Sequence, residues 1–143
     1  MTDWPWDLDT LPAPLIPLAD TFEGFLGLEW IELTSTSARV RFEVRDNLKQ
    51  PLGLLHGGIY SAVAETVASV ATVRAVWRQQ LIGSGLSNQA SFLRPITGGS
   101  VGVTARLRHH ADREWLWSHE FRDDRDRLCA LVDVTIAVRP ARS

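Results

Sequence analysis

The sequence predicts an α+β fold in which one long helix lies against a mostly antiparallel sheet of about five to six strands. Only residues 57 to about 78 form an apolar stretch long enough for such a helix. Two strand-like segments precede this stretch, and up to four follow it. Because the helix and the sheet each have only the other to cover their apolar faces, we expect two packed layers.

The chain begins with a proline-rich arm, which we place at residues 1–19 ahead of a single domain at residues 20–140. Four prolines in the first 17 residues disfavour helix, so an extended arm or covering strand is expected, and a disordered tail remains the alternative. Trp4 and Trp6 would dock on the body if the arm is ordered.

A short helix is expected next, with Asp20 or Thr21 as its N-cap and Gly27 at its end. Its apolar face is predicted to hold Phe22, Phe25 and Leu26. Strands follow at residues 28–33 and 38–44, where inward Ala38, Val40, Phe42 and Val44 alternate with charged residues.

Beyond the long helix, Gly83 and Gly85 are predicted to precede the next strand at residues 86–93. Further strands are expected at residues 100–108, 114–121 and 128–138. Trp115 and Trp117 should share one face of their strand, and Cys129 should lie in the core.

Composition excludes several classes of protein. A net charge of −2 over 143 residues argues against binding to nucleic acid or to an anionic membrane, since both need a cationic face. One cysteine allows no internal disulfide, and the acidic N-terminus does not resemble a signal peptide. No uncharged apolar run of about 18 residues is present, so we expect a cytoplasmic protein without a membrane span.

Glu65 is the one charged residue in the first four turns of the predicted helix. At about 100° per residue, its side of the helix is small and partly polar, whereas the opposite side is bulky and should pack on the sheet. The small side comprises Gly58, Ser61, Ala62, Ala68, Ser69 and Thr72, and the bulky side Ile59, Val63, Val67, Val70 and Trp77. A glutamate is most often a surface residue, but an exposed face would carry more charge, so a carboxylate acting in a partly dry cleft is equally favoured.

The helix is predicted to begin at His56-Gly57-Gly58. The first N–H groups of a helix have no internal partner, and glycine lets a ligand approach them closely. Such a site suits an oxyanion that develops on a carbonyl group, although the same triplet is also found as a simple turn with a histidine cap.

These residues together resemble the hotdog-fold acyl-CoA thioesterases. The similarity is to the branch of the Arthrobacter-type 4-hydroxybenzoyl-CoA thioesterase and the 1,4-dihydroxy-2-naphthoyl-CoA thioesterase, which carries Gln-x-x-Gly-x-x-His-Gly-Gly, then an acid, then Ser or Thr one turn later. Here the pattern is Gln50, Gly53, His56-Gly57-Gly58, Glu65 and Ser69. The related phenylacetate-pathway type usually has Asp at the helix position, so Glu65 favours the first branch.

The resemblance implies hydrolysis of an aroyl- or fatty acyl-CoA to the free acid and CoA. It implies that Glu65 is the nucleophile or the general base, that the Gly57 N–H is the oxyanion donor, and that His56, Gln50 and Ser69 position the reacting groups. It also implies substrate or CoA contacts for Gly58, Ser91, Arg94, His109 and Arg113. The chain departs from the family at Phe92, which replaces a polar residue, and at Ala111, where a glycine is usual.

No cofactor beyond the CoA of the substrate is implied, and no metal. Adjacent His109 and His110 should point to opposite faces of a strand and so should not share an ion. The family further implies a homodimer with the active site at its interface, paired into a homotetramer. The alternatives are a non-catalytic acyl-CoA-binding or sensing hotdog protein, and a hotdog dehydratase, whose His/Asp placement is absent.

Overall fold

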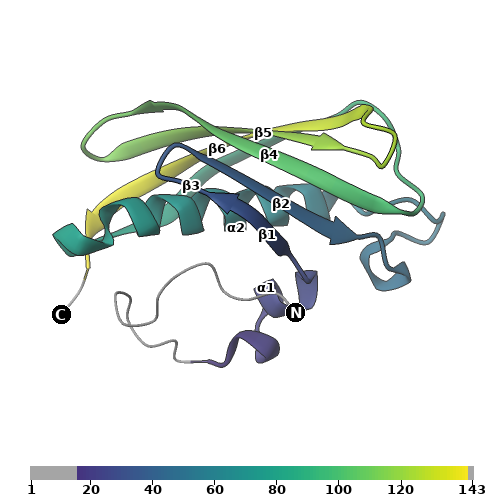
Figure 1. Ribbon diagram of the computed structural model, residues 1–143, viewed down its shortest axis with the longest axis horizontal. Coiled ribbons are helices and arrows are strands. Elements are labelled where there is room, and N and C mark those ends of the chain that lie inside the picture. The colour runs from purple at the N-terminus through teal and green to yellow at the C-terminus, as the bar shows by residue number, and fades with distance from the viewer. Residues whose placement is uncertain (1–15, 142–143) are drawn as a thin grey trace.

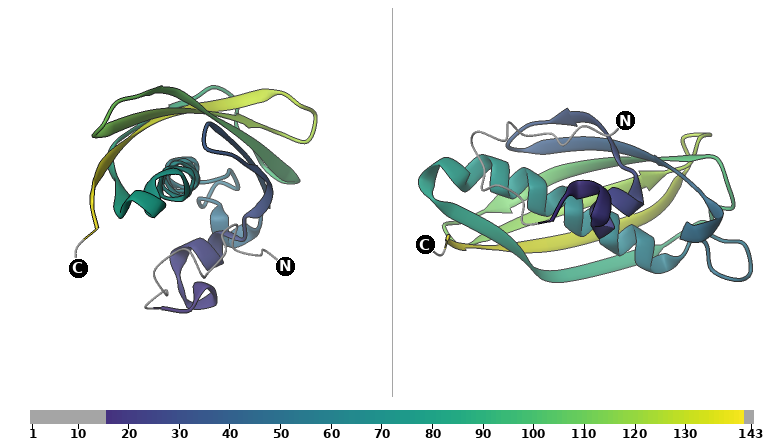
Figure 2. Two further views of the ribbon diagram at one scale, coloured as in Figure 1. Left: turned by 60° about the vertical axis from the view of Figure 1, so that its left-hand side comes forward. Right: turned by 90° about the horizontal axis from the view of Figure 1, so that it is seen from below.

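A six-stranded antiparallel sheet curves around one long helix in a computed structural model that describes residues 16–141 (Figure 1). The helix is α2 (Gly57–Val76), and the sheet order is β1-β2-β4-β5-β6-β3. Seen along the helix, the sheet wraps one side of it and leaves the other side open (Figure 2). The strands are β1 (Glu29–Leu33), β2 (Ser37–Glu43), β3 (Leu81–Phe92), β4 (Ser100–His110), β5 (Glu114–Arg122) and β6 (Leu128–Pro140). The predicted α+β class is confirmed, whereas residues 1–15 of the predicted arm, including Trp4 and Trp6, lie outside the described residues.

The short helices match their predicted boundaries but not all of their predicted burial. A 3-10 turn, η2 (Leu18–Asp20), leads into α1 (Phe22–Leu26), whose N-cap Thr21 accepts a hydrogen bond from the Gly24 N–H. Gly27 ends α1 at φ 67°, a left-handed conformation that favours glycine. Phe22 and Phe25 are exposed and only Leu26 is buried, because α1 lies apart from the sheet (Figure 1).

Alternation predicted the strand faces correctly. Ala38, Val40 and Phe42 on β2 are at most 2% exposed, while the residues between them face solvent. On β5, Trp117 is buried and Trp115 packs on the core from the same face. Cys129 is fully buried, as expected.

The loop before α2 holds the 3-10 turn η3 (Asp46–Leu48), and a second turn, η4 (Trp77–Gln79), follows α2. The bulky residues Ile59, Val63, Val67 and Val70 are buried, as predicted. Ala68 and Thr72 were predicted on the open side but are fully buried as well. Thr72 explains this difference, because its Oγ1 donates to the Ala68 carbonyl and accepts from Trp117 Nε1 at 2.9 Å, so this stripe of α2 seats on β5.

Strand β3 begins earlier than the sequence indicates, and both glycines lie inside it. A Cβ on Gly83 would lie 2.8 Å from Ile136 Cγ2 and 3.2 Å from Thr72 Cγ2. A Cβ on Gly85 would lie 3.0 Å from Glu65 Cδ. Gly83 therefore lets α2 approach β3, and Gly85 leaves room for the Glu65 carboxylate; neither glycine forms a turn.

By length and composition alone, α2 with η4 could cross a membrane. However, 61% of its apolar window is buried against the rest of the fold. Core helices have the same composition because they too must be apolar on several sides.

His119, on β5, is a fully buried histidine of the core. Its Nδ1 lies 3.0 Å from the Val132 carbonyl oxygen, and Nε2 has no hydrogen-bond partner within the described part of the chain. Burial lowers the pKa of His119 from 6.5 to about 4, although the carbonyl groups of Val132 and Ala64 act in the opposite direction. The neutral ring therefore donates from Nδ1 and leaves only a lone pair unpaired.

This histidine should make the fold sensitive to acid. The unfolded imidazole takes up a proton near pH 6.5, but the folded one does so only near pH 4. The free energy of unfolding should therefore fall as pH drops through this window, by on the order of 3 kcal/mol in total. Urea unfolding at pH 7 and pH 4.5, at one protein concentration, measures this loss. His119→Leu should lose less stability than the wild type over the same window, whereas exposed His109→Gln should behave as the wild type; an unchanged slope in His119→Leu would contradict the assignment.

Candidate active site

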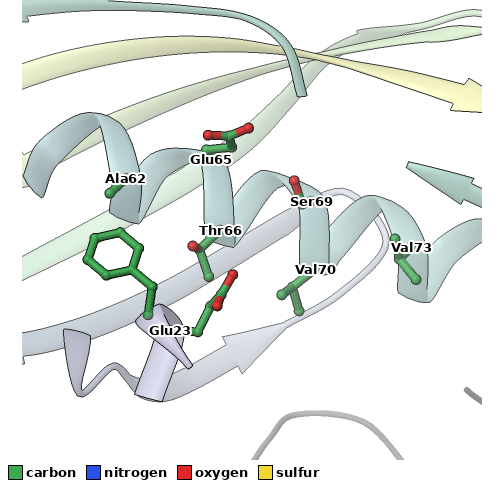
Figure 3. Close-up of a pocket in the computed structure, with 8 residues that line it drawn as sticks. Glu23, Ala62, Glu65, Thr66, Ser69, Val70 and Val73 are labelled. Atoms are coloured by element: carbon green, nitrogen blue, oxygen red, sulfur yellow. The ribbon is translucent and has the colours of Figure 1, made fainter. Parts of the chain in front are cut away.

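A pocket of about 390 Å³ opens between α1 and α2 (Figure 3). It is lined by Phe22, Glu23, Ala62, Glu65, Thr66, Ser69, Val70 and Val73. Glu65 and Ser69 stand one turn apart on the same side of α2, while Glu23 reaches toward the helix from α1 (Figure 3). The structure thus brings together the predicted carboxylate and its predicted hydroxyl neighbour.

The carboxylate of Glu65 rests against the main chain of β3. Gly85 provides the space, since any side chain at this position would overlap the carboxylate. Three residues further along β3, the Asn88 amide donates to the Ser61 carbonyl at 2.9 Å and joins β3 to the preceding turn of α2. Glu65 is exposed in the single chain, so the partly dry cleft expected from the sequence is not formed by one chain alone.

The N-terminus of α2 is built as the sequence indicated. The His56 side chain caps the helix, because its Nδ1 accepts from the Gly58 N–H at 2.9 Å. Within residues 16–141 the Gly57 N–H meets no acceptor, so it remains available to an external one. A Cβ on Gly57 would lie 3.1 Å from Phe92 Cζ, so the Phe92 ring forms a wall beside this N–H.

Phe92, where the family usually has a polar residue, is 58% exposed and packs on Tyr60 at 5.4 Å between ring centroids. Tyr60 packs in turn on the buried Phe121 ring at 5.2 Å. Burial raises the pKa of Tyr60 to about 12, so its hydroxyl stays neutral in water of ordinary pH. The first turn of α2 is therefore flanked by aromatic side chains.

Gln50 lies in the loop before α2. Its side-chain oxygen accepts a hydrogen bond from the Leu52 N–H, and its carbonyl accepts from the Gly53 N–H at 2.9 Å. Gly53 has φ 86°, which this tight loop requires. The Gln50 N–H donates to the Leu54 carbonyl at 2.8 Å, two residues before His56, so Gln50 lies near the start of α2.

One chain does not unite all the predicted catalytic groups. Gly57 and Glu65 lie eight positions apart on one helix, which separates them by about 12 Å along its axis. A single thioester carbonyl 3 Å or so from the Gly57 N–H is therefore out of reach of the same chain's Glu65.

The predicted substrate and CoA contacts fall at both ends of the molecule. The Arg94 N–H donates to the Cys129 carbonyl at the beginning of β6, and two residues later the Ile96 carbonyl accepts from the Leu55 N–H, just before α2. Ser91 is exposed nearby on β3. Arg113 lies at the other end, where its carbonyl accepts from the Val138 N–H. Arg94 and Arg113 of one chain are thus separated by nearly the length of β6 and do not meet at one phosphate group.

His109 and His110 lie on opposite faces of β4, as predicted. His109 pairs with outward Leu116, whereas His110 pairs with Trp115 and packs on its ring at 5.0 Å. Among residues 16–141, no group of three or more histidine, cysteine or acidic side chains is placed to hold a metal ion.

Three site residues were missed from the sequence: Gly85, Phe22 and Glu23. Gly85 was predicted to precede the strand in which it lies, and the residues of α1 gave no sign that they approach α2. A glycine inside a strand can mark close packing of another element, but Gly85 carried this signal only once the strand was placed correctly.

Comparison with known proteins identifies the family. The Thioesterase superfamily matches residues 52–130, which include the start of α2, Glu65 and most of the sheet. This chain belongs to the thioesterase superfamily. It is a hotdog-fold thioester hydrolase, and the predicted fold and reaction class are confirmed.

Its relatives span nearly the same length. Rv1847 of Mycobacterium tuberculosis, named as a candidate esterase, is 37% identical over 92% of this chain and 94% of the relative. Its solved structure has a TM-score of 0.80 over 85% of this chain and 98% of that one. The 1,4-dihydroxy-2-naphthoyl-CoA hydrolase of Escherichia coli is 30% identical over 80% of this chain and 84% of the relative. A Pseudomonas aeruginosa thioesterase, PA1618, is 27% identical with a TM-score of 0.80 over 85% and 87% of the two chains.

Gly85→Ala tests the seat of the carboxylate. The added Cβ should push Glu65 away from β3, because no space exists between them, and thioester hydrolysis should fall at least tenfold in kcat. A matched control is Gly102→Ala, since a Cβ on Gly102 meets no atom within 4 Å. Steady-state kinetics on both variants, with circular dichroism to verify folding, make the comparison. A wild-type kcat in folded Gly85→Ala would show that catalysis does not depend on the position of the Glu65 carboxylate against β3.

Proposed function

We propose that this enzyme is an acyl-CoA thioesterase that hydrolyses an aroyl- or fatty acyl-CoA to the free acid and CoA, with Glu65 as its catalytic carboxylate. The observation that carries the proposal is the position of Glu65. Glu65 is the one acidic residue of α2, and its carboxylate lies against Gly85 of β3. It lines a pocket together with Ser69.

Two routes begin from this carboxylate. Glu65 attacks the thioester carbonyl carbon and forms an anhydride that water then opens, or it takes a proton from a water molecule that attacks the same carbon. In both routes the carbonyl oxygen gains negative charge, the carbon–sulfur bond breaks, and CoA leaves as a thiolate that takes up a proton. The unpaired Gly57 N–H, at the positive end of α2, suits this oxyanion.

We further propose that each site combines two copies of the chain. The separation of about 12 Å between Gly57 and Glu65 on one helix requires that the oxyanion donor come from a partner. Strand β3 offers the means, because it is a 12-residue edge strand without a charged side chain. Pairing of β3 with β3 of a second copy would give a two-fold dimer and bring the open sides of both helices together.

In this arrangement Glu65 and Ser69 of one chain act with Gln50, His56 and Gly57 of the other. His56 fixes the helix entrance by capping it, and Gln50 orients the carbonyl or the water. Arg94, Arg113 and His109 are candidates for the CoA phosphates, with Gly58 and Ser91 along the path of the substrate. Because Arg94 and Arg113 lie at opposite ends of one chain, a shared phosphate site would take them from different chains.

The relatives support this assignment. One is a 1,4-dihydroxy-2-naphthoyl-CoA hydrolase. The Pseudomonas aeruginosa thioesterase was solved as a glutamine-to-alanine mutant, and a Staphylococcus aureus relative as a glutamate-to-alanine mutant. Gln50 and Glu65 are the same two residue types. We propose no cofactor beyond the CoA of the substrate, a cytoplasmic location, and assembly of two dimers into a tetramer.

Glu65→Gln removes the charge without changing the size of the side chain. This substitution should lower kcat by about 10²- to 10⁴-fold, because the glutamine amide neither attacks the carbonyl carbon nor accepts a proton. The measurement is release of free thiol from benzoyl-, 4-hydroxybenzoyl-, phenylacetyl- and short- to long-chain acyl-CoA. Exposed Glu32→Gln on β1 is the matched control and should leave kcat unchanged. Absence of turnover in the wild type, with CoA thioesters still raising its melting temperature, would instead favour an acyl-CoA-binding protein.

Gly57→Pro tests the oxyanion donor and the sharing of the site. Proline at the first position of a helix is well tolerated but has no N–H, so kcat should fall by about 10²- to 10³-fold. Gly57→Ala, which keeps the N–H and also contacts Phe92, is the control and should retain most activity.

A mixture of Gly57→Pro and Glu65→Gln chains then distinguishes a shared site from a single-chain site. If each site uses two chains, a hybrid dimer has one fully intact site, and random pairing restores roughly a quarter of the wild-type rate. If each site uses one chain, every site in the mixture carries a defect and the rate stays low.

A further inference from the structure

The short helix α1 holds a fixed position over the open side of α2. Its N-cap Thr21 donates to the Leu18 carbonyl at 2.6 Å, and Gly24 is so close to the preceding turn that a Cβ would lie 2.9 Å from the Leu18 carbonyl carbon. Arg45, beyond β2, donates to the Phe25 carbonyl and covers the Phe25 ring at 5.2 Å. Contacts from two directions therefore set where α1 presents its side chains.

Glu23 is one of the side chains that α1 presents to the pocket. Its carboxylate points toward α2 near Thr66 and Val70, on the side of the pocket opposite the sheet (Figure 3). No ion pair joins Glu23 to any residue in the range 16–141. Its charge is therefore not neutralised by a neighbouring cation.

The lining of the pocket has a definite chemical character. It contains two carboxylates, Glu23 and Glu65, two hydroxyls, Thr66 and Ser69, and an apolar surface. The apolar surface comes from Phe22, Ala62, Val70 and Val73. None of the eight lining residues is cationic. A group that enters beside α1 must satisfy the apolar walls and also meets the negative charge of Glu23.

We infer that this pocket receives the acyl group and that Glu23 is a specificity-determining residue that rejects acyl groups carrying a second carboxylate. This inference rests on the proposed function, because it assigns the acyl side of the site centred on Glu65. A like charge brought close to Glu23 is repelled, and the repulsion grows as the entering acyl group displaces water from the pocket. An uncharged aromatic or aliphatic acyl group meets no such penalty and packs on Phe22 and the valines.

The test compares two thioesters that differ in one substituent, 4-hydroxybenzoyl-CoA and 4-carboxybenzoyl-CoA. The measured quantity is the ratio of their kcat/KM values. The wild type should prefer the hydroxyl compound by at least tenfold. Glu23→Gln should reduce this preference at least tenfold, by accelerating hydrolysis of the carboxylated compound, and Glu23→Lys should reduce it further. Glu23→Asp, which keeps the charge, should keep the preference.

Glu32→Gln is the matched control, because it removes the same charge from the exposed edge of β1 and should leave the ratio unchanged. A wild type without preference, an unchanged ratio in folded Glu23→Gln, or an equal change in Glu32→Gln would each overturn the inference.

Binding measured without turnover separates this inference from the proposed function. In Glu65→Gln protein, the ratio of the two dissociation constants should still favour 4-hydroxybenzoyl-CoA, and the added Glu23→Gln change should reduce the ratio by at least fivefold. A lower ratio in the double variant supports the selectivity of Glu23 even if the wild type hydrolyses neither thioester. An unchanged ratio overturns it even if Glu65 proves catalytic.

Discussion

The close approach of α2 to β3 is the contact on which the rest of the structure depends. Two glycines of β3 lie at this contact: Gly83 faces Ile136 and Thr72, and Gly85 leaves room for the Glu65 carboxylate. The first allows the core to close, because Thr72 then reaches the Trp117 indole. The second lets a carboxylate lie beside main-chain atoms within an otherwise apolar helix. Stability and chemistry therefore use the same strand, and a side chain at either position would disturb one of them.

Much of the fold was accessible from the sequence because it depends on local pattern. Alternation along β2 and β5 places each residue by its own neighbours, and the Thr21 cap and Gly27 stop are likewise encoded within one turn. Gly83 and Gly85 were misassigned because their role depends on a helix that lies opposite them. Thr72 and Ala68 were placed on the wrong side for the same reason: which stripe of a mostly apolar helix meets the sheet is decided by packing, not by periodicity.

The candidate site divides in the same way. The spacing from Gln50 to Glu65 marks a recognisable set of residues, and the structure retains the capped helix entrance and the carboxylate one turn from Ser69. The motif alone does not show that Gly57 and Glu65 are too far apart to act on one carbonyl group. That distance follows only when the rise of the helix between them is taken into account. Nor does it reveal Glu23, whose position depends on Arg45 holding α1 from a distant loop.

The two edges of the sheet differ in a way that limits how the sheet can grow. Strand β3 is long and uncharged, whereas β1 has five residues, two of them glutamates, and a bulge in its pairing with β2. Charged, short and irregular edges resist the addition of another strand. A sheet with one receptive edge and one resistant edge can be extended once, by a copy of itself facing the opposite way, and then presents only resistant edges. Strand β3 therefore allows two copies to pair, and β1 prevents further strands from adding. This difference protects the chain from assembling edge to edge into a fibre.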